Sequence, residues 1–198
     1  MTDAIFNALP ARQGHFLLES GYHTDLWLTL DALFVSPQRL APLDTELASR
    51  LRAHGTGAVC GPLLGGAFLA HAVATALDVD FYFAEPVASG APSGLFEAQY
   101  RLPAELHRRL SGARVAVVDD VISAGSSVRA TAAALSAAGA TTVAIGTILL
   151  LGAVARDHFA SLGVPLEALE QRDFALWQPA TCPLCRAGAP LEDPLRSG

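Results

Sequence analysis

Short apolar runs follow one another along the chain and are separated by segments with helical periodicity. The runs have the length of β-strands and lie at residues 56–60, 80–84, 114–118, 142–151 and 164–169. Helices are predicted from Ser36-Pro37 onward, where Leu40, Leu43, Leu47 and Leu51 recur at helical spacing, and at residues 67–77 and 126–138. Uninterrupted apolar strands that alternate with helices are typical of an α/β fold with a central parallel sheet flanked by helices.

The two ends of the chain lack this alternation. Residues 15–18 and 26–34 are predicted to be extended, on either side of a turn at 20–23. The Pro-rich tail from Trp177 onward is expected to be irregular, and residues 85–103 form either a long loop or a hairpin. With 198 residues and no internal repeat or long linker, the chain is expected to fold as one domain.

Composition and charge exclude several classes of protein. Hydrophobic residues are 52% and charged residues 16%, which excludes a disordered chain. The net charge of −6 argues against a nucleic-acid partner. No apolar run reaches the roughly 18 residues that cross a bilayer, so no membrane partner is expected. Three cysteines and no signal-peptide pattern favour a cytoplasmic location. All 13 basic residues are arginine, so no lysine is available for chemistry.

The segment from Val117 to Ser127 carries the strongest chemical signal. A buried strand ends in Asp119 and Asp120, and a turn of small and hydroxyl residues then leads into a helix. Backbone N–H groups, hydroxyls and the positive end of a helix dipole suit a phosphate, and Gly125 would let the backbone approach it. The carboxylates would instead accept hydrogen bonds from a sugar's neighbouring hydroxyls or partner a metal. The alternative is an acidic helix cap without a ligand.

This segment resembles the phosphoribosyl pyrophosphate signature of type I phosphoribosyltransferases. The resemblance implies that Asp119 and Asp120 hold the ribose hydroxyls and, through ribose or water, Mg²⁺ as cofactor. It implies that the turn at 123–127 grips the 5′-phosphate. The donor-binding residues implied by the family are Leu63, Leu64, Gly65, Asp119, Asp120, Val121, Ile122, Ser123, Ala124, Gly125, Ser126 and Ser127.

Three further segments resemble the orotate phosphoribosyltransferase branch. They are the run Gly14-His15-Phe16-Leu17-Leu18-Glu19-Ser20-Gly21, the turn Gly61-Pro62-Leu63-Leu64-Gly65-Gly66, and the tail Cys182-Pro183-Leu184-Cys185. The resemblance implies a type I phosphoribosyltransferase-like fold. The whole chain, residues 1–198, would form one such domain, with a core at about 37–170 and a small hood from 1–36 and 171–198. It also implies a homodimer in which each active site is completed by a partner loop.

The sequence departs from the branch pattern in two places. The loop at 85–103 lacks the family's lysines and histidine, and Arg101 is its one cation. The catalytic residues are therefore predicted to be Arg101 together with Asp119 and Asp120 of the signature segment. The family's Asp-Arg pair, whose arginine contacts the orotate carboxylate, is replaced by Leu151-Gly152. The base-binding candidates are then Ser123 and Arg156.

The sequence therefore predicts a glycosyltransferase of pyrimidine nucleotide biosynthesis. It would transfer 5-phosphoribosyl from phosphoribosyl pyrophosphate to a pyrimidine base, orotate, and release pyrophosphate. Two alternatives stay open, namely a different acceptor base and a non-catalytic sensor of phosphoribosyl pyrophosphate or a nucleotide. Because the expected arginine is missing, weak or no orotate activity is predicted.

A few other residues have chemical potential. Cys182 and Cys185 form one C-x-x-C, but zinc usually needs four ligands and the chain has no second pair, so a small knuckle or plain packing is favoured. His15 and His23 flank the N-terminal turn and either approach the base pocket or serve structurally. Trp27 and Trp177 are interpreted as packing or dimer contacts.

Overall fold

The computed structural model describes residues 5, 9–87, 95–96 and 98–194. A six-stranded sheet with the order β5-β4-β3-β6-β7-β8 forms its centre. The strands are β3 (Ala58–Pro62), β4 (Asp80–Pro86), β5 (Tyr100–Arg101), β6 (Arg114–Ile122), β7 (Thr141–Leu151) and β8 (Leu166–Arg172). All neighbours pair in parallel except β5, which pairs antiparallel with β4. The predicted α/β class with a central parallel sheet is confirmed.

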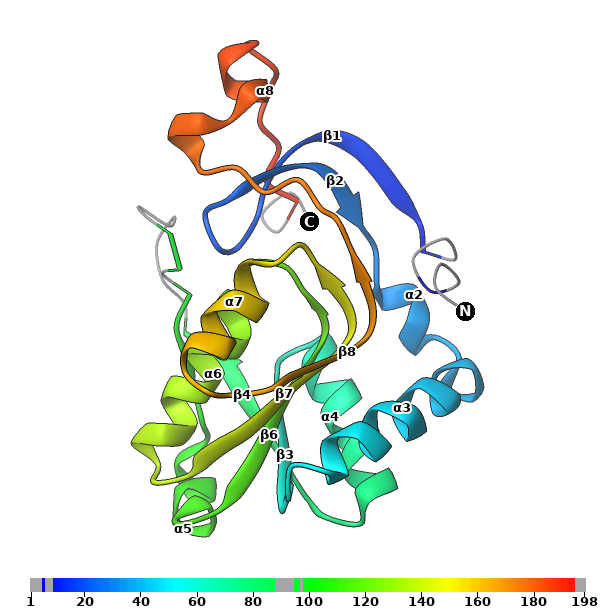
Figure 1. The fold of residues 1–198 in the computed structure, drawn as a ribbon, viewed down its shortest axis with the longest axis vertical. Helices are drawn as coiled ribbons and strands as arrows, with labels where there is room; N and C mark the ends of the chain where they lie inside the picture. Colours follow the sequence, from blue (N-terminus) through cyan, green and yellow to red (C-terminus); the bar gives the residue numbers. More distant parts are fainter. Residues whose placement is uncertain (1–4, 6–8, 88–94, 97, 195–198) are drawn as a thin grey trace.

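Two hydrophobic clusters cover opposite faces of the sheet. On β6, Val115 and Val117 belong to one cluster, and Ala116 and Val118 to the other, because successive strand residues point to opposite faces. The first cluster is covered by α6 (Ser126–Ala137) and α7 (Val154–Ser161), together with η1 (Ala104–Leu106) and α5 (His107–Leu110). The second is covered by α3 (Pro37–Arg52) and α4 (Gly65–Leu77). Figure 1 shows these helices on either side of the sheet.

The chain ends come together as a separate small layer. Strands β1 (Ala11–Leu17) and β2 (His23–Leu28) form an antiparallel pair. The tail, with η2 (Pro179–Thr181) and α8 (Pro183–Arg186), joins this pair through bridges from His23 to Trp177 and from Phe16 to Glu192. In Figure 1 the tail, in orange and red, lies beside the blue hairpin. We call residues 11–28, which comprise β1, β2 and the turn between them, together with residues 173–194, the hood.

Several local predictions differ from the structure, and three of them bear on the core. The extended segment predicted to residue 34 stops at Leu28, and α2 (Asp31–Phe34) follows; its Leu33 and Phe34 pack against the α3 and α4 cluster. Strand β6 continues four residues beyond the predicted end at Val118, since its pairing with β7 continues to Ile122. The sequence reading missed α7, a two-turn helix that buries only Ala155 and Phe159.

Within the described part of the chain, no helix is both long enough and apolar enough to cross a membrane.

Candidate active site

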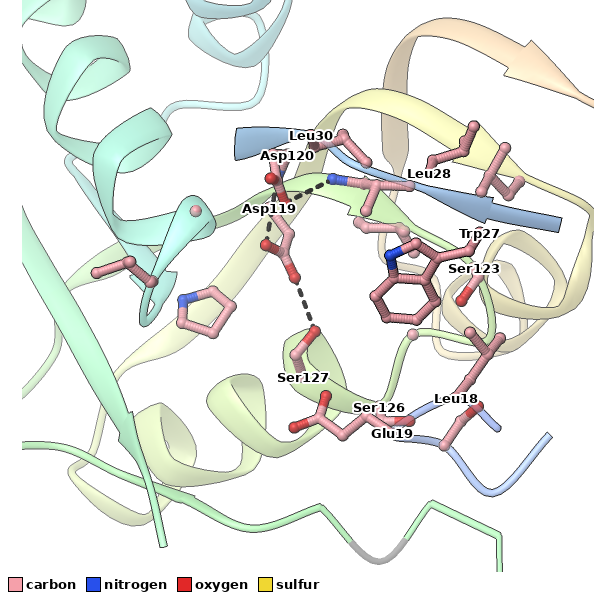
Figure 2. A pocket seen from close by; sticks show the side chains of 18 of the residues that line it. Leu18, Glu19, Trp27, Leu28, Leu30, Asp119, Asp120, Ser123, Ser126 and Ser127 are labelled. Atoms are coloured by element: carbon pink, nitrogen blue, oxygen red, sulfur yellow. Dashed lines mark hydrogen bonds between the residues drawn. The ribbon is translucent and has the colours of Figure 1, made fainter. Parts of the chain in front are cut away.

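A cavity of about 400 Å³ opens between the carboxyl end of β6, the turn before α4 and the hood. The carboxyl ends of parallel strands are where α/β sheets usually bind ligands. Figure 2 shows the carboxylates of β6, the start of α6 and side chains of the hood around one space. The lining residues are Leu18, Glu19, Ser20, Trp27, Leu28, Thr29, Leu30, Pro62, Leu63, Leu64, Gly65, Tyr100, Asp119, Asp120, Val121, Ile122, Ser123, Gly125, Ser126, Ser127, Leu151 and Phe174.

The two aspartates differ in their surroundings. Asp119 is 7% exposed; its carboxylate accepts a 2.7 Å hydrogen bond from the Ser127 hydroxyl and a 3.1 Å bond from the Asp120 N–H. Asp120 is half-buried, and its carboxylate accepts a 2.9 Å bond from the Val121 N–H. Burial, and then the charge of Asp120, raise the pKa of Asp119 well above its usual range. Crowded, partly desolvated carboxylates of this kind favour a ligand that brings hydroxyl donors or a cation.

The glycine-rich turn after β3 brings backbone close to these carboxylates. A Cβ at Gly65 would lie 2.4 Å from an Asp120 carboxylate oxygen, and one at Gly66 would lie 2.6 Å from Asp119 Oδ1. A Cβ at Gly61 would lie 2.0 Å from the backbone oxygen of Gly66. The Gly61 contact is with backbone and requires glycine, whereas a Cβ at Gly65 or Gly66 would displace the carboxylates from their positions in the cavity.

The turn between β6 and α6 forms the opposite wall. Gly125 is the N-cap of α6 with φ +85°, a left-handed conformation that favours glycine. Its missing Cβ would point at the Ala155 Cβ, 3.0 Å away, rather than into the cavity as the sequence reading supposed. The Ser126 hydroxyl is buried beside the cavity and has no hydrogen-bond partner among the described residues. An anion at the start of α6 would give this hydroxyl a partner.

A third carboxylate, from the hood, was missed by the sequence reading. Glu19 lines the cavity and accepts a 3.0 Å hydrogen bond from the Tyr100 hydroxyl. Its pKa is raised, mainly by burial. The acid lies inside the Glu19-Ser20-Gly21 part of the N-terminal motif, but nothing in the sequence indicates that the hood folds over β6.

The remaining wall is apolar. Leu28, Leu30 and Leu151 belong to one cluster against which Val121 and Phe174 pack, and the indole of Trp27 also lines the space. In Figure 2 this indole faces the same space as the Asp119 carboxylate. Trp27 thus belongs to the cavity wall, which the packing interpretation did not anticipate. Among the described lining residues there is no arginine, lysine or histidine.

Most of the predicted site residues come together here, and three do not line the cavity. Ala124 is fully buried behind the turn. Arg101 forms a 3.2 Å ion pair with Glu85 on the surface. Arg156 donates a 3.3 Å hydrogen bond from its guanidinium to the Leu166 carbonyl. Neither arginine lines the cavity in this single chain, so their predicted roles stay predictions.

The N-terminal histidines do not face the cavity either. His15 and His23 are 3% and 4% exposed and lie 3.0 Å apart, Nε2 to Nδ1, on the side of the hairpin that faces the tail. The expected approach of one of them to the base pocket is therefore wrong, because neither lines the cavity, and the structural alternative agrees with their positions.

The chain is similar to known phosphoribosyltransferases. Residues 42–162 match the family model described as "Phosphoribosyl transferase domain". The chain is 32% identical to an orotate phosphoribosyltransferase of Thermotoga maritima, over 92% of this chain and 90% of that one. It is 34% identical to the orotate phosphoribosyltransferase of Pelotomaculum thermopropionicum, over 96% and 94%.

Solved structures show the same fold at lower identity. The orotate phosphoribosyltransferase of Aeropyrum pernix superposes with a TM-score of 0.60 at 23% identity, covering 81% of this chain and 87% of that one. An adenine phosphoribosyltransferase from Thermoanaerobacter pseudethanolicus gives 0.62 at 16% identity, over 86% and 99%. At these identities the structures support the fold alone, and the fold is shared by members with different acceptor bases.

Proposed function

Because the chain belongs to the phosphoribosyltransferase family, we propose that this cavity binds phosphoribosyl pyrophosphate and transfers its 5-phosphoribosyl group to a pyrimidine base of the orotate type. The observation that carries the proposal is one cavity with paired carboxylates at the end of β6, a glycine-rich turn facing them, and a hydroxyl-rich helix start beside them. Together these elements offer acceptors for sugar hydroxyls and donors for phosphates, the two kinds of group that phosphoribosyl pyrophosphate carries.

Each part of the donor has a candidate binding group. Asp119 and Asp120 accept hydrogen bonds from the ribose 2′- and 3′-hydroxyls. The turn at 123–127 holds the 5′-phosphate with backbone N–H groups, the unpartnered Ser126 hydroxyl and the α6 dipole. The turn at 63–65 places backbone against the pyrophosphate. Ser123, at the edge of the space beside Trp27, borders the base.

The site fits Mg²⁺ as the cofactor. Carboxylate oxygens are ligands that Mg²⁺ prefers, and Asp119 and Asp120 bring two carboxylates to one wall of the cavity. Asp119 and Asp120 would hold the ion through ribose or water. Bound Mg²⁺ supplies charge neutralisation for the departing pyrophosphate. The protein's own part is to fix the ribose, orient C1 toward the base and keep water away behind the hood.

The base end favours a neutral ring over an anion. Its described walls are Trp27, three leucines, Val121 and Phe174, and no cation faces them. A carboxylate placed there would lose hydration without gaining a partner. This observation favours the second candidate function, which is the same transfer to an acceptor without a carboxylate, and it supports weak orotate activity.

The acceptor is tested by measuring pyrophosphate release with phosphoribosyl pyrophosphate, Mg²⁺ and one base at a time. We expect release with a pyrimidine, and a kcat/KM for orotate that does not exceed that for uracil. A fast orotate reaction that rejects uracil would overturn the assignment of a neutral base end. Donor binding without release for any of orotate, uracil and adenine would point to the sensor alternative.

We also propose that the chain works as a homodimer in the cytoplasm. Leu64 and Phe68, at the start of α4, are 62% and 50% exposed, and Phe68 touches Phe34 with ring centroids 5.6 Å apart. Apolar surface beside an active site suits a subunit contact, and a partner loop could bring Arg101 to the neighbouring pyrophosphate. Light scattering should give twice the 20.6 kDa of one chain; a strict monomer would exclude shared sites.

We propose, finally, that the core and the hood act as a single domain over residues 1–198, with the core at about 37–170. Support comes from the cavity itself, because β6 and the hood both line it.

A further inference from the structure

Four metal-ligating side chains meet inside the hood, away from the cavity. His15 and His23 come from the facing strands β1 and β2, and Cys182 and Cys185 from the tail. One nitrogen or sulfur atom of each lies within 4.8 Å of those of all the others. More than 150 residues of chain separate the histidines from the cysteines, so the fold, and not a local motif, creates the cluster.

The spacing of the four atoms fits a tetrahedral zinc ion. His15 Nε2 lies 3.4 Å from Cys182 Sγ and 3.7 Å from Cys185 Sγ. His23 Nδ1 lies 3.3 Å from Cys185 Sγ and 3.0 Å from His15 Nε2. With Zn–S near 2.3 Å and Zn–N near 2.0–2.1 Å, tetrahedral geometry requires about 3.5 Å between nitrogen and sulfur and about 3.3 Å between nitrogens. Four of the six distances thus lie close to those of a zinc site, and the other two are at most 4.8 Å.

The surroundings orient the ligands as zinc sites do. His15 Nδ1 lies 3.0 Å from the Ala189 carbonyl oxygen; a proton on Nδ1 that is donated to this oxygen leaves Nε2 free to face the sulfurs. The Cys185 N–H points at Cys182 Sγ, 3.5 Å away, and so favours a thiolate there. His15, His23 and Cys182 are each less than 5% exposed, while Cys185 lies at the surface and gives a route for entry.

We propose that His15, His23, Cys182 and Cys185 bind one structural Zn²⁺, through Nε2, Nδ1 and two thiolates. Four protein ligands leave no open position for water or substrate, so the ion is structural and not catalytic. Binding forms two Zn–N and two Zn–S bonds, and the two thiol protons leave to solvent. The two histidines are the ligand pair that the sequence pattern alone did not reveal, because they do not lie in a second C-x-x-C.

The ion would fix the two strands of the hood and the tail relative to one another. His15 and His23 stand on either side of the hairpin turn, and that turn carries Leu18, Glu19 and Ser20 to the cavity. A metal bonded to both strands and to the tail would hold this turn in place over β6. The proposal does not depend on which substrate the cavity takes, since metal content is measured without substrate.

The test is the zinc content of the reduced, full-length protein by plasma mass spectrometry. We expect one zinc per chain in the wild type and in two control variants, Cys60→Ala and His71→Ala, which change a cysteine in the core and an exposed histidine outside the cluster. Cys185→Ser, at the surface, should lose most of the zinc, and chelation should lower the Tm of the wild type.

Cobalt substitution of the wild type gives a readout that needs no variant. Co²⁺ should produce the visible absorption of a tetrahedral ion and a near-ultraviolet thiolate-to-metal band. Reduced protein that takes up neither zinc nor cobalt would overturn the proposal. So would a Cys185→Ser protein with undiminished zinc, or a Cys182–Cys185 disulfide that persists in reductant and carries no metal.

Discussion

At the ribose end of the cavity the walls carry carboxylates, hydroxyls and bare backbone, whereas at the base end they carry leucines, Trp27 and Phe174. The ribose end comes from β6, the start of α6 and the glycine turn, all within the core. The base end comes largely from β2 and the segments after β7 and β8. Under the proposed function, this difference assigns donor recognition to a strand and turns of the core, and acceptor recognition largely to the hood.

The largest expected effect is at Gly125, in the wall of the ribose end. A β-branched side chain at φ +85°, with its Cβ against Ala155, would displace the turn that begins α6. Gly125→Val should reduce donor binding below detection in calorimetry. Gly112→Val is the matched control, because Gly112 has φ +74° and a Cβ there would touch nothing within 4 Å. The control should lose similar stability and keep its donor affinity. Equal loss of binding in both variants would show that lost stability, and not displacement of the turn before α6, causes the effect.

A smaller effect is expected at the carboxylates. Asp119→Asn and Asp120→Asn should each weaken phosphoribosyl pyrophosphate binding by about 10–100-fold, corresponding to roughly 1–3 kcal/mol for a charge-assisted contact. Calorimetric titration with the donor and Mg²⁺ measures it. Unchanged affinity in both variants would contradict the ribose assignment.

The raised pKa of Asp119 predicts that the stability of the protein depends on pH. Burial and the neighbouring Asp120 raise its pKa, so the folded protein holds this proton more tightly than the unfolded chain and loses stability as pH rises above about 4, the ordinary Asp value. Asp119→Asn should therefore unfold at a higher temperature than the wild type at pH 8, with the difference shrinking toward pH 4. Differential scanning calorimetry measures the two Tm values. A variant less stable than the wild type at pH 8 would show that neighbouring groups already stabilise the ionised Asp119 carboxylate.

The two ends also differ in how far the sequence predicted them. Asp119, Asp120 and the turn at 123–127 are contiguous, so the sequence pattern groups them at one strand end, and all of them except Ala124 line the cavity. Glu19 and Trp27 reach the cavity only because the hairpin folds over β6, and His15 and His23 meet the cysteines only because the tail returns to the hairpin. Such contacts between distant segments leave no local periodicity. The short helices α2 and α7 were missed for a related reason, since each makes too few turns to show a pattern.

At the base end, removing the indole should affect the acceptor and spare the donor. Trp27→Ala should raise the KM for the base by about tenfold, which is the scale of one aromatic contact of 1–1.5 kcal/mol. Donor affinity serves as the internal control, because the ribose contacts lie on the other wall. An equal loss of donor affinity would show that the two ends are not separable.

The smallest expected effect comes from restoring the missing cation. Gly152 has φ +75°, and a Cβ there would make only ordinary contacts, the nearest at 3.6 Å. Gly152→Arg should raise the ratio of orotate to uracil kcat/KM by up to about tenfold, or about 1.4 kcal/mol. Gly152→Gln carries the same backbone strain without the charge and should leave the ratio unchanged. The same increase in both variants would rule out charge as the cause.

The most direct measurement is a crystal structure with phosphoribosyl pyrophosphate and Mg²⁺ bound. The account predicts the 5′-phosphate over the turn at 123–127 with the Ser126 hydroxyl as a donor, the ribose hydroxyls on Asp119 and Asp120, and C1 directed toward the wall that holds Trp27. A donor whose phosphate lies elsewhere, with the turn at 123–127 empty, would contradict it.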